Sequence, residues 1–196
     1  HPTRGSMPEA AEGKIYNTCA VFAPEGNLLG KYSKMHLFDI QVTGGVAFKE
    51  SDTLAAGGEP LVVDTAFGRI GVAICFDIRF PELARLLALE GAQLICLPGA
   101  FNMTTGPAHW ALSIRMRAVD NQVYFAAASP ARDVDFSYVA YGHSMLADPW
   151  GNIVCEADEK EGVAYGVIDT DYLEQVRREL PLLSARRTDV YRLNGK

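Results

Sequence analysis

Apolar runs and helical stripes of apolar residues alternate through the middle of the chain. Residues 70–75, 93–99 and 123–129 are short, nearly continuous apolar runs, which is typical of strands buried on both faces. Between them, residues 81–92 and 106–122 carry apolar side chains at helical spacing, and each begins with a proline in its first turn. This alternation predicts a parallel sheet with helices packed against it.

The flanking segments predict further strands. Residues 14–34 contain two apolar stretches around the polar turn 24–27, which is a hairpin pattern. A second pair of strands is predicted within residues 61–75. Residues 143–170 predict three strands separated by turns, and residues 171–180 predict a final helix.

The segment before the second strand pair has a different character. Residues 36–60 are rich in glycine and polar residues and show no sustained periodicity, so they predict a long loop of the kind that tends to be functional. Sites in open α/β sheets form at the carboxyl ends of strands. Cys75, residues 98–100 and residues 129–130 all follow predicted strands, so we expect a site at this edge.

Composition excludes several classes of function. The chain has 196 residues, 48% of them hydrophobic, and no stretch long enough to cross a bilayer. A net charge of −6 argues against a nucleic-acid partner. The beginning of the sequence lacks the apolar core of a secretory signal, and the four cysteines are too widely spaced for a disulfide framework or a zinc site. We therefore expect a cytoplasmic protein with reduced thiols and with no metal or nucleotide cofactor.

Cys75 differs from the other cysteines in its surroundings. An isolated cysteine after an apolar run is commonly a small core residue. A helix begins shortly after Cys75, Arg79 is close in sequence, and the segment before the loop could bring Lys31 or Lys34 across the sheet. Because cations and helix N-termini lower a thiol pKa, these neighbours favour a reactive thiol. The remaining cysteines lie inside predicted strands and are interpreted as core residues: Cys19, Cys96 and Cys155.

Six sequence blocks, in order, resemble the nitrilase, or carbon–nitrogen hydrolase, superfamily. They are KMHLFD (34–39), FKES (48–51), AICFDIRFPELAR (73–85), GAFNMTTGPAHW (99–110), RAVDNQVY (117–124) and YGHSMLADPWG (141–151). The resemblance runs from about Lys14 to about Tyr191, and the fourth and fifth blocks favour the ω-amidase branch. It implies a four-layer α-β-β-α sandwich that forms a homodimer or a higher homo-oligomer. Residues 7–193 are then one domain, and residues 1–6 are a native loop or a remnant of cloning.

The resemblance also implies roles for individual residues. Cys75 matches the nucleophile, Lys34 the catalytic lysine and Glu50 a supporting glutamate. A thiolate that attacks an amide carbonyl forms an oxyanion, which Lys34 and the backbone N–H of Phe76 could stabilise. For a substrate that carries a carboxylate, Arg79 is the candidate cation.

Other residues complete the expected substrate pocket. Phe76, Phe101 and Thr105 are candidates for its lining. For Arg79, a salt bridge to Asp77 or Glu82 is the structural alternative to substrate binding.

One element of the family pattern has no counterpart in this sequence. The family triad includes a first glutamate on a strand and helix unit well upstream of the lysine, and this amino-terminal unit is missing here. Glu9, Glu12 and Glu25 fall in a predicted loop or turn and are poor substitutes for a general base. We therefore expect either one piece of a larger enzyme or a naturally truncated relative, and no amide turnover by this chain alone.

The leading functional hypothesis is an amidase that acts on small molecules. It would cleave the terminal amide of dicarboxylate monoamides, such as α-ketoglutaramate, to an acid and ammonia through a cysteine thioester. One alternative is the Nit1-like branch, which acts on deaminated glutathione, or another carbon–nitrogen hydrolase. Another is a non-catalytic assembly module of the same fold.

Overall fold

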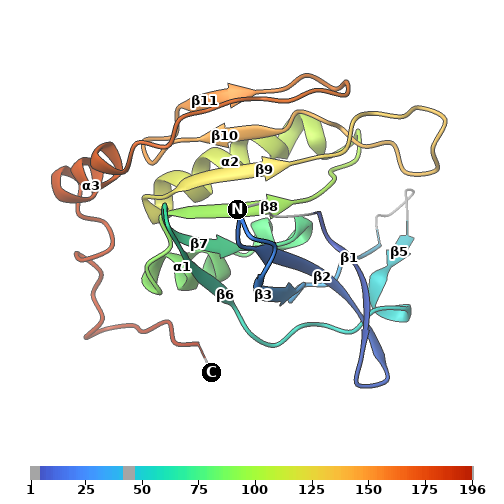
Figure 1. The fold of residues 1–196 in the computed structure, drawn as a ribbon, viewed down its shortest axis with the longest axis horizontal. Coiled ribbons are helices and arrows are strands. Elements are labelled where there is room, and N and C mark those ends of the chain that lie inside the picture. Colours follow the sequence, from blue (N-terminus) through green and yellow to red (C-terminus); the bar gives the residue numbers. More distant parts are fainter. Residues whose placement is uncertain (1–4, 42–46, 196) are drawn as a thin grey trace.

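The computed structural model of the chain describes residues 5–41 and 47–195 and contains two packed sheets with helices on one side (Figure 1). The larger sheet has six strands. In spatial order they are β11 (Ile153–Glu156), β10 (Met145–Ala147), β9 (Tyr124–Ala128), β8 (Leu94–Pro98), β7 (Gly68–Val72) and β6 (Leu61–Thr65).

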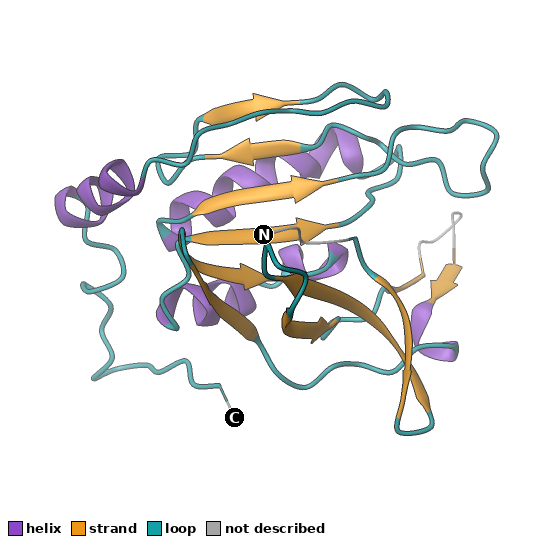
Figure 2. Cartoon of the chain, in the orientation of Figure 1, coloured by secondary structure: helices purple, strands orange, loops and turns teal. Residues whose placement is uncertain are grey.

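The centre of this sheet is parallel, as the alternation of strands and helices predicts. β7 pairs with β8 and β8 pairs with β9 in parallel, whereas β6, β10 and β11 pair antiparallel to their neighbours. The connecting helices, α1 (Pro81–Leu89) and α2 (Gly106–Asn121), cover one face of the sheet (Figure 2). Their buried residues, among them Leu87, Trp110 and Ile114, join the main core because the apolar stripe of each helix faces the strands.

The smaller sheet supplies the second β layer. It consists of β1 (Met7–Ala11), β2 (Lys14–Phe22) and β3 (Leu28–Ser33), all antiparallel. The predicted hairpin is confirmed: β2 and β3 flank a turn in which Ala23 N–H donates to the Asn27 carbonyl at 2.8 Å. Cys19, Val21 and Tyr32 of this sheet are fully buried and share one core cluster with the larger sheet.

Four sequence predictions differ from the structure in detail. The predicted loop 36–60 contains an antiparallel pair, β4 (Asp39–Gln41) with β5 (Ala47–Lys49), and a 3-10 helix, η1 (Glu50–Asp52); its residues 42–46 lie outside the described residues. The third strand predicted within 143–170 is wrong: residues 162–168 lie in no strand, because they pair with no neighbouring backbone in the described chain.

The third difference concerns the segment around Cys75. The strand predicted over 70–75 ends at Val72, and Cys75 opens a 3-10 helix, η2 (Cys75–Arg79). The final helix is confirmed as α3 (Thr170–Glu179) and lies beyond the end of the larger sheet (Figure 1).

The predicted α/β sandwich of two sheets is confirmed, and the described residues provide three of the four layers that the resemblance implies. Residues 5–41 and 47–195 provide one helical layer, the six-stranded sheet and the three-stranded sheet. Glu9 lies in strand β1 rather than in the predicted loop. Residues 1–4 of the segment interpreted as a loop or a cloning remnant lie outside the described residues.

Candidate active site

Cys75 occupies a sharp turn at the carboxyl edge of the parallel strands. Its φ of 47° lies in the left-handed region, which is uncommon for a residue other than glycine. Two hydrogen bonds between Asp77 and Ile74 close the turn: the Asp77 carboxylate accepts the Ile74 N–H at 2.9 Å, and the Asp77 N–H donates to the Ile74 carbonyl at 3.0 Å. A Cβ at Gly99 would come within 2.7 Å of the Cys75 Cα, so a glycine at the end of β8 gives this turn its space.

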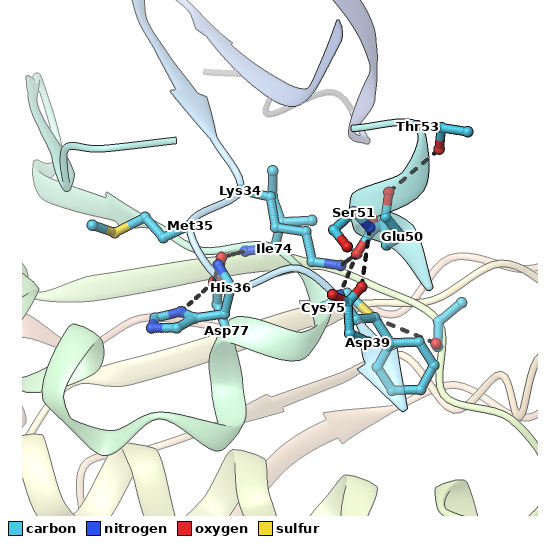
Figure 3. A network of polar contacts seen from close by, with 12 residues as sticks. Lys34, Met35, His36, Asp39, Glu50, Ser51, Thr53, Ile74, Cys75 and Asp77 are labelled. Atoms are coloured by element: carbon cyan, nitrogen blue, oxygen red, sulfur yellow. Dashed lines mark hydrogen bonds and ion pairs between the residues drawn. The ribbon is translucent and has the colours of Figure 1, made fainter. Parts of the chain in front are cut away.

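A buried ion pair lies beside the cysteine (Figure 3). Lys34 Nζ is 2.6 Å from Glu50 Oε2, and the Lys34 side chain is only 3% exposed. Glu50 Oε2 also accepts the Phe38 N–H at 2.6 Å, so the carboxylate is held from two directions. The lysine backbone is fixed as well: its N–H donates to Asn17 and its carbonyl accepts from Gly57.

The electrostatics of the thiol follow from these neighbours. Burial raises the pKa of Cys75 above its ordinary value, and the charge of Lys34 opposes that rise. The negative charges of Glu50 and Asp77 act in the same direction as burial. Cys75 Sγ lies 3.5 Å from the Ala100 carbonyl, to which the neutral thiol donates. The resting side chain is therefore a thiol that must lose a proton before it attacks.

A cavity of about 890 Å³ opens in front of Cys75. All seven candidate residues from the sequence line it: Lys34, Glu50, Cys75, Phe76, Arg79, Phe101 and Thr105. The ends of β8 and β9 contribute to the wall through residues 96–100 and 126–130, as the edge rule predicts. Within the described chain, Glu50 is the carboxylate that lines this cavity.

Arg79 presents a cation to the cavity. Its guanidinium lies 4.7 Å from the centre of the Phe101 ring, and its Nη1 lies 3.2 Å from His109 Nδ1. No ion pair joins Arg79 to a carboxylate in residues 5–41 and 47–195, so the structural alternative, a salt bridge to Asp77 or Glu82, is not found there. Burial lowers the pKa of Arg79, which reflects a charge partly removed from water.

Lys31, the second lysine considered for the cysteine, points elsewhere. It is exposed and forms an ion pair with Glu9 across the β1–β3 surface. Side chains alternate between the two faces of a strand, so Tyr32 enters the core where Lys31 faces solvent. Lys34, just beyond the end of β3, is the lysine that reaches the cavity.

Tyr138 is a cavity residue that the sequence analysis missed. Its hydroxyl donates to the Ala100 carbonyl at 2.9 Å, the same oxygen that faces Cys75 Sγ. Burial raises its pKa to about 12, so the phenol stays a donor. Tyr138 lies in a polar segment without periodicity, and nothing in the sequence signalled that it turns toward the cavity.

The described residues contain neither a candidate metal site nor a membrane-spanning helix. Among residues 5–41 and 47–195, no group of three or more His, Cys, Asp or Glu side chains could hold a metal ion. In the same part of the chain, no helix has the length and apolar character to span a bilayer.

The fold and the cavity define a class of protein: an α/β sandwich with a cysteine, lysine and glutamate gathered at the carboxyl edge of parallel strands. The carbon–nitrogen hydrolase family model matches residues 3–178. The chain belongs to the carbon–nitrogen hydrolase family, whose enzymes hydrolyse carbon–nitrogen bonds such as those of amides.

Individual relatives are similar to this chain over nearly its whole length. Omega-amidase NIT2 of Bos taurus is 53% identical over 192 residues, which cover 98% of this chain and 70% of the relative. Omega-amidase NIT2 of Danio rerio is 54% identical over 191 residues, covering 97% and 69%. The crystal structure of Saccharomyces cerevisiae Nit3, a member of branch 10 of the nitrilase superfamily, superposes with a TM-score of 0.85 at 46% identity. It covers 93% of this chain and 65% of the yeast chain, and it confirms the nitrilase-type fold.

Proposed function

We propose that the protein is an ω-amidase, which hydrolyses the terminal amide of a small dicarboxylate monoamide to an acid and ammonia. The observation that carries the proposal is the juxtaposition of Cys75 with the buried Lys34–Glu50 pair in one cavity. The similarity of this chain to two relatives named omega-amidase supports the same reaction.

The chemistry begins at the cysteine. The Cys75 thiolate attacks the amide carbon, and the carbonyl oxygen becomes an oxyanion. The ammonium of Lys34 and the backbone N–H of Phe76 stabilise that oxyanion. Ammonia leaves as the C–N bond breaks, and water then hydrolyses the resulting thioester, which returns the thiol.

Proton transfer requires a further group. Lys34 is a cation and cannot accept the proton of the thiol. Glu50 Oε2 already accepts hydrogen bonds from Lys34 and Phe38, so we assign Glu50 to holding the lysine side chain in place. The resemblance to the family assigns the proton transfers to a separate glutamate.

Arg79 is proposed to select substrates that carry a carboxylate. A guanidinium partly withdrawn from water, with no carboxylate partner among the described residues, can form two parallel hydrogen bonds to a substrate carboxylate. Phe76 and Phe101 provide apolar walls for the carbon chain. The Thr105 hydroxyl donates to Asn102 at 3.0 Å, so we propose Thr105 as a wall residue rather than a direct donor to substrate.

Release of ammonia from succinamate tests the function. This chain alone is expected to release none, so the assay supplies the amino-terminal family unit with the first glutamate, in the same chain or as a separate fragment, and this complete form is the wild type of every kinetic test. For it we expect turnover that the substitution Cys75→Ala abolishes while folding is preserved, because alanine removes only the sulfur. The matched control is Cys19→Ala, at a buried cysteine of the smaller sheet, which should lower stability and leave turnover in place. Equal turnover of the Cys75→Ala protein would overturn the proposal, and a folded wild type without activity on any amide would favour the assembly module.

The same assay separates the amidase branches. A higher kcat/KM for deaminated glutathione than for succinamate or α-ketoglutaramate would favour the Nit1-like branch over the ω-amidase branch. We also propose that the protein is cytoplasmic, because four widely spaced cysteines are typical of reduced thiols. We propose that it forms a homodimer or a higher homo-oligomer, as the resemblance implies. Light scattering after size-exclusion chromatography measures the oligomer directly.

A further inference from the structure

Asp77 is a charged residue buried beneath the cavity, and the proposed reaction does not use it. It is 1% exposed. Three donors and the His36 ring nitrogen Nδ1 converge on its two carboxylate oxygens. Oδ2 accepts from the Tyr32 hydroxyl at 2.7 Å and from the Ile74 N–H at 2.9 Å. Oδ1 accepts from the His36 N–H at 3.0 Å and lies 2.7 Å from His36 Nδ1. Buried carboxylates persist when hydrogen bonds replace their hydration, and here both oxygens are satisfied.

These contacts join the two segments that carry the proposed chemistry. Ile74 directly precedes Cys75, so one arm of the network holds the turn of the cysteine. Tyr32 and His36 lie two residues before and two residues after Lys34, so the other arms hold the chain on both sides of the lysine. Figure 3 shows the His36 and Ile74 arms on Asp77. The His36 ring is also stacked on the Phe80 ring, with the two ring centres 3.7 Å apart, which fixes the histidine against the end of η2.

We propose that Asp77 is a positioning residue, which sets the distance and direction between the Lys34 ammonium and the Cys75 sulfur. This inference rests on the proposed function for its kinetic consequences. Lys34 follows a strand of the smaller sheet and Cys75 follows a strand of the larger sheet, and no hydrogen bond in the described chain joins their side chains directly. The Asp77 carboxylate bridges that gap through Tyr32 and His36, with the buried charge strengthening each hydrogen bond.

The chemistry of the tyrosine agrees with this role. Burial and the adjacent Asp77 carboxylate raise the pKa of Tyr32, so its hydroxyl remains a donor throughout the working range of pH. The same hydroxyl accepts the Met35 N–H at 3.3 Å, which ties the residue that follows Lys34 to the network. Removing that single oxygen frees one arm of the bridge and leaves both charged groups in the cavity.

The test compares Tyr32→Phe with a matched control, Tyr124→Phe. Tyr124 is also a buried tyrosine, 2% exposed, and its hydroxyl bonds to the backbone of Asp169. Neither Tyr124 nor Asp169 lines the cavity. We expect Tyr32→Phe to lower kcat about tenfold with KM unchanged, and Asp77→Asn to lower it about 10²-fold, because small misplacements of a reacting group have effects of that order. Tyr124→Phe should change thermal stability only.

A second measurement does not depend on amide turnover. The rate of Cys75 alkylation by iodoacetamide against pH reports the thiol pKa, which Lys34 lowers. Tyr32→Phe leaves the groups acting on the thiol in place, namely Lys34, Glu50, Asp77, Arg79 and Tyr138. We expect the pH midpoint of alkylation of the Tyr32→Phe protein to rise toward that of Lys34→Met. In kinetics, we expect Tyr32→Phe to add less than about a threefold loss of kcat in the Lys34→Met background, because the two changes act through the same lysine.

Two results would overturn the inference. One is a Tyr32→Phe protein with a wild-type kcat and alkylation midpoint that loses stability as Tyr124→Phe does. The other is a full tenfold loss from Tyr32→Phe in the Lys34→Met background, which would make the two effects independent. If the wild-type protein turns over no amide, the proposed function fails, and the alkylation midpoints still decide the role of Asp77.

Discussion

At the scale of single residues, the site depends on charges removed from water. Lys34 is held by Glu50 within a cavity whose walls are largely apolar, so its charge acts on nearby groups with little screening. Arg79 is partly buried without a carboxylate partner among the described residues. In the proposed reaction, Lys34 faces the reacting carbonyl and Arg79 binds the remote carboxylate of the substrate.

Lys34→Met keeps the length of the side chain and deletes the charge. We predict that kcat falls by about 10²-fold or more, comparable with removing one oxyanion donor. Since Lys34 lowers the Cys75 pKa, its removal raises that pKa further, and the thiolate fraction at neutral pH falls. Steady-state kinetics and the pH dependence of alkylation measure the two effects. A change confined to KM would mean that Lys34 only binds substrate.

Arg79→Gln removes the proposed carboxylate contact and retains hydrogen-bonding capacity. We predict that KM for succinamate rises about 10- to 100-fold, the range expected for a lost hydrogen bond between charged groups. Butyramide carries no carboxylate and serves as the control substrate, for which the variant and the wild type should have similar kcat/KM. An equal loss on both substrates would assign Arg79 a structural role.

At the scale of elements, the cysteine turn depends on the close approach of β8. The end of β8 passes so near that a methyl group at Gly99 would meet the Cys75 backbone. The fixed Cys75 conformation therefore comes from two sides: from Asp77 within η2 and from Gly99, which directly follows β8.

Gly99→Ala should displace that turn. We predict a loss of about 1–3 kcal/mol in the free energy of unfolding, as for overpacking elsewhere, together with a lower kcat. Gly58→Ala is the control, because a Cβ at Gly58 meets no atom within 4 Å. Chemical denaturation and kinetics measure both variants, and a Gly99→Ala protein with wild-type kcat would show that the turn tolerates displacement.

The sequence predicts the elements that carry strong patterns and misses those whose neighbours decide their structure. The apolar runs of β7, β8 and β9 signal buried strands wherever they occur, so the parallel centre was predictable. Residues 162–168 look like a strand but pair with no backbone in the described chain. The bridging role of Asp77 is visible only once Tyr32 and His36 are folded onto it, because sequence separation hides the contact.

At the scale of the whole molecule, α3 is attached to the rest of the fold by its buried residues Leu173 and Val176 and by the hydrogen bonds of one arginine. Arg177 Nε donates to the Gln122 carbonyl at 3.0 Å, and Nη2 donates to the Ala92 carbonyl at 3.0 Å. Gln122 in turn donates to the carbonyls of Val176 and Leu180. This network ties the carboxyl-terminal helix to the ends of α1 and α2, and none of its residues lines the cavity of Cys75.

Arg177→Ala should therefore separate stability from catalysis. We predict a loss of about 1.5–3 kcal/mol in the free energy of unfolding, since a charged donor is removed from two carbonyls. The Cys75 alkylation rate of the folded protein should be unchanged. Glu174→Ala removes only the exposed partner of Arg177 and should have a much smaller effect on stability. A large change in alkylation would show that α3 is coupled to the cavity.

The central claim is that Cys75 becomes acylated during turnover. Rapid acid quenching during hydrolysis of succinamate, followed by mass spectrometry of the digested protein, tests it most directly. The account predicts the succinyl mass increment on the peptide that contains Cys75, in wild-type protein and absent in Cys75→Ala. Turnover with the acyl group on a different residue, or undiminished turnover by Cys75→Ala, would contradict it.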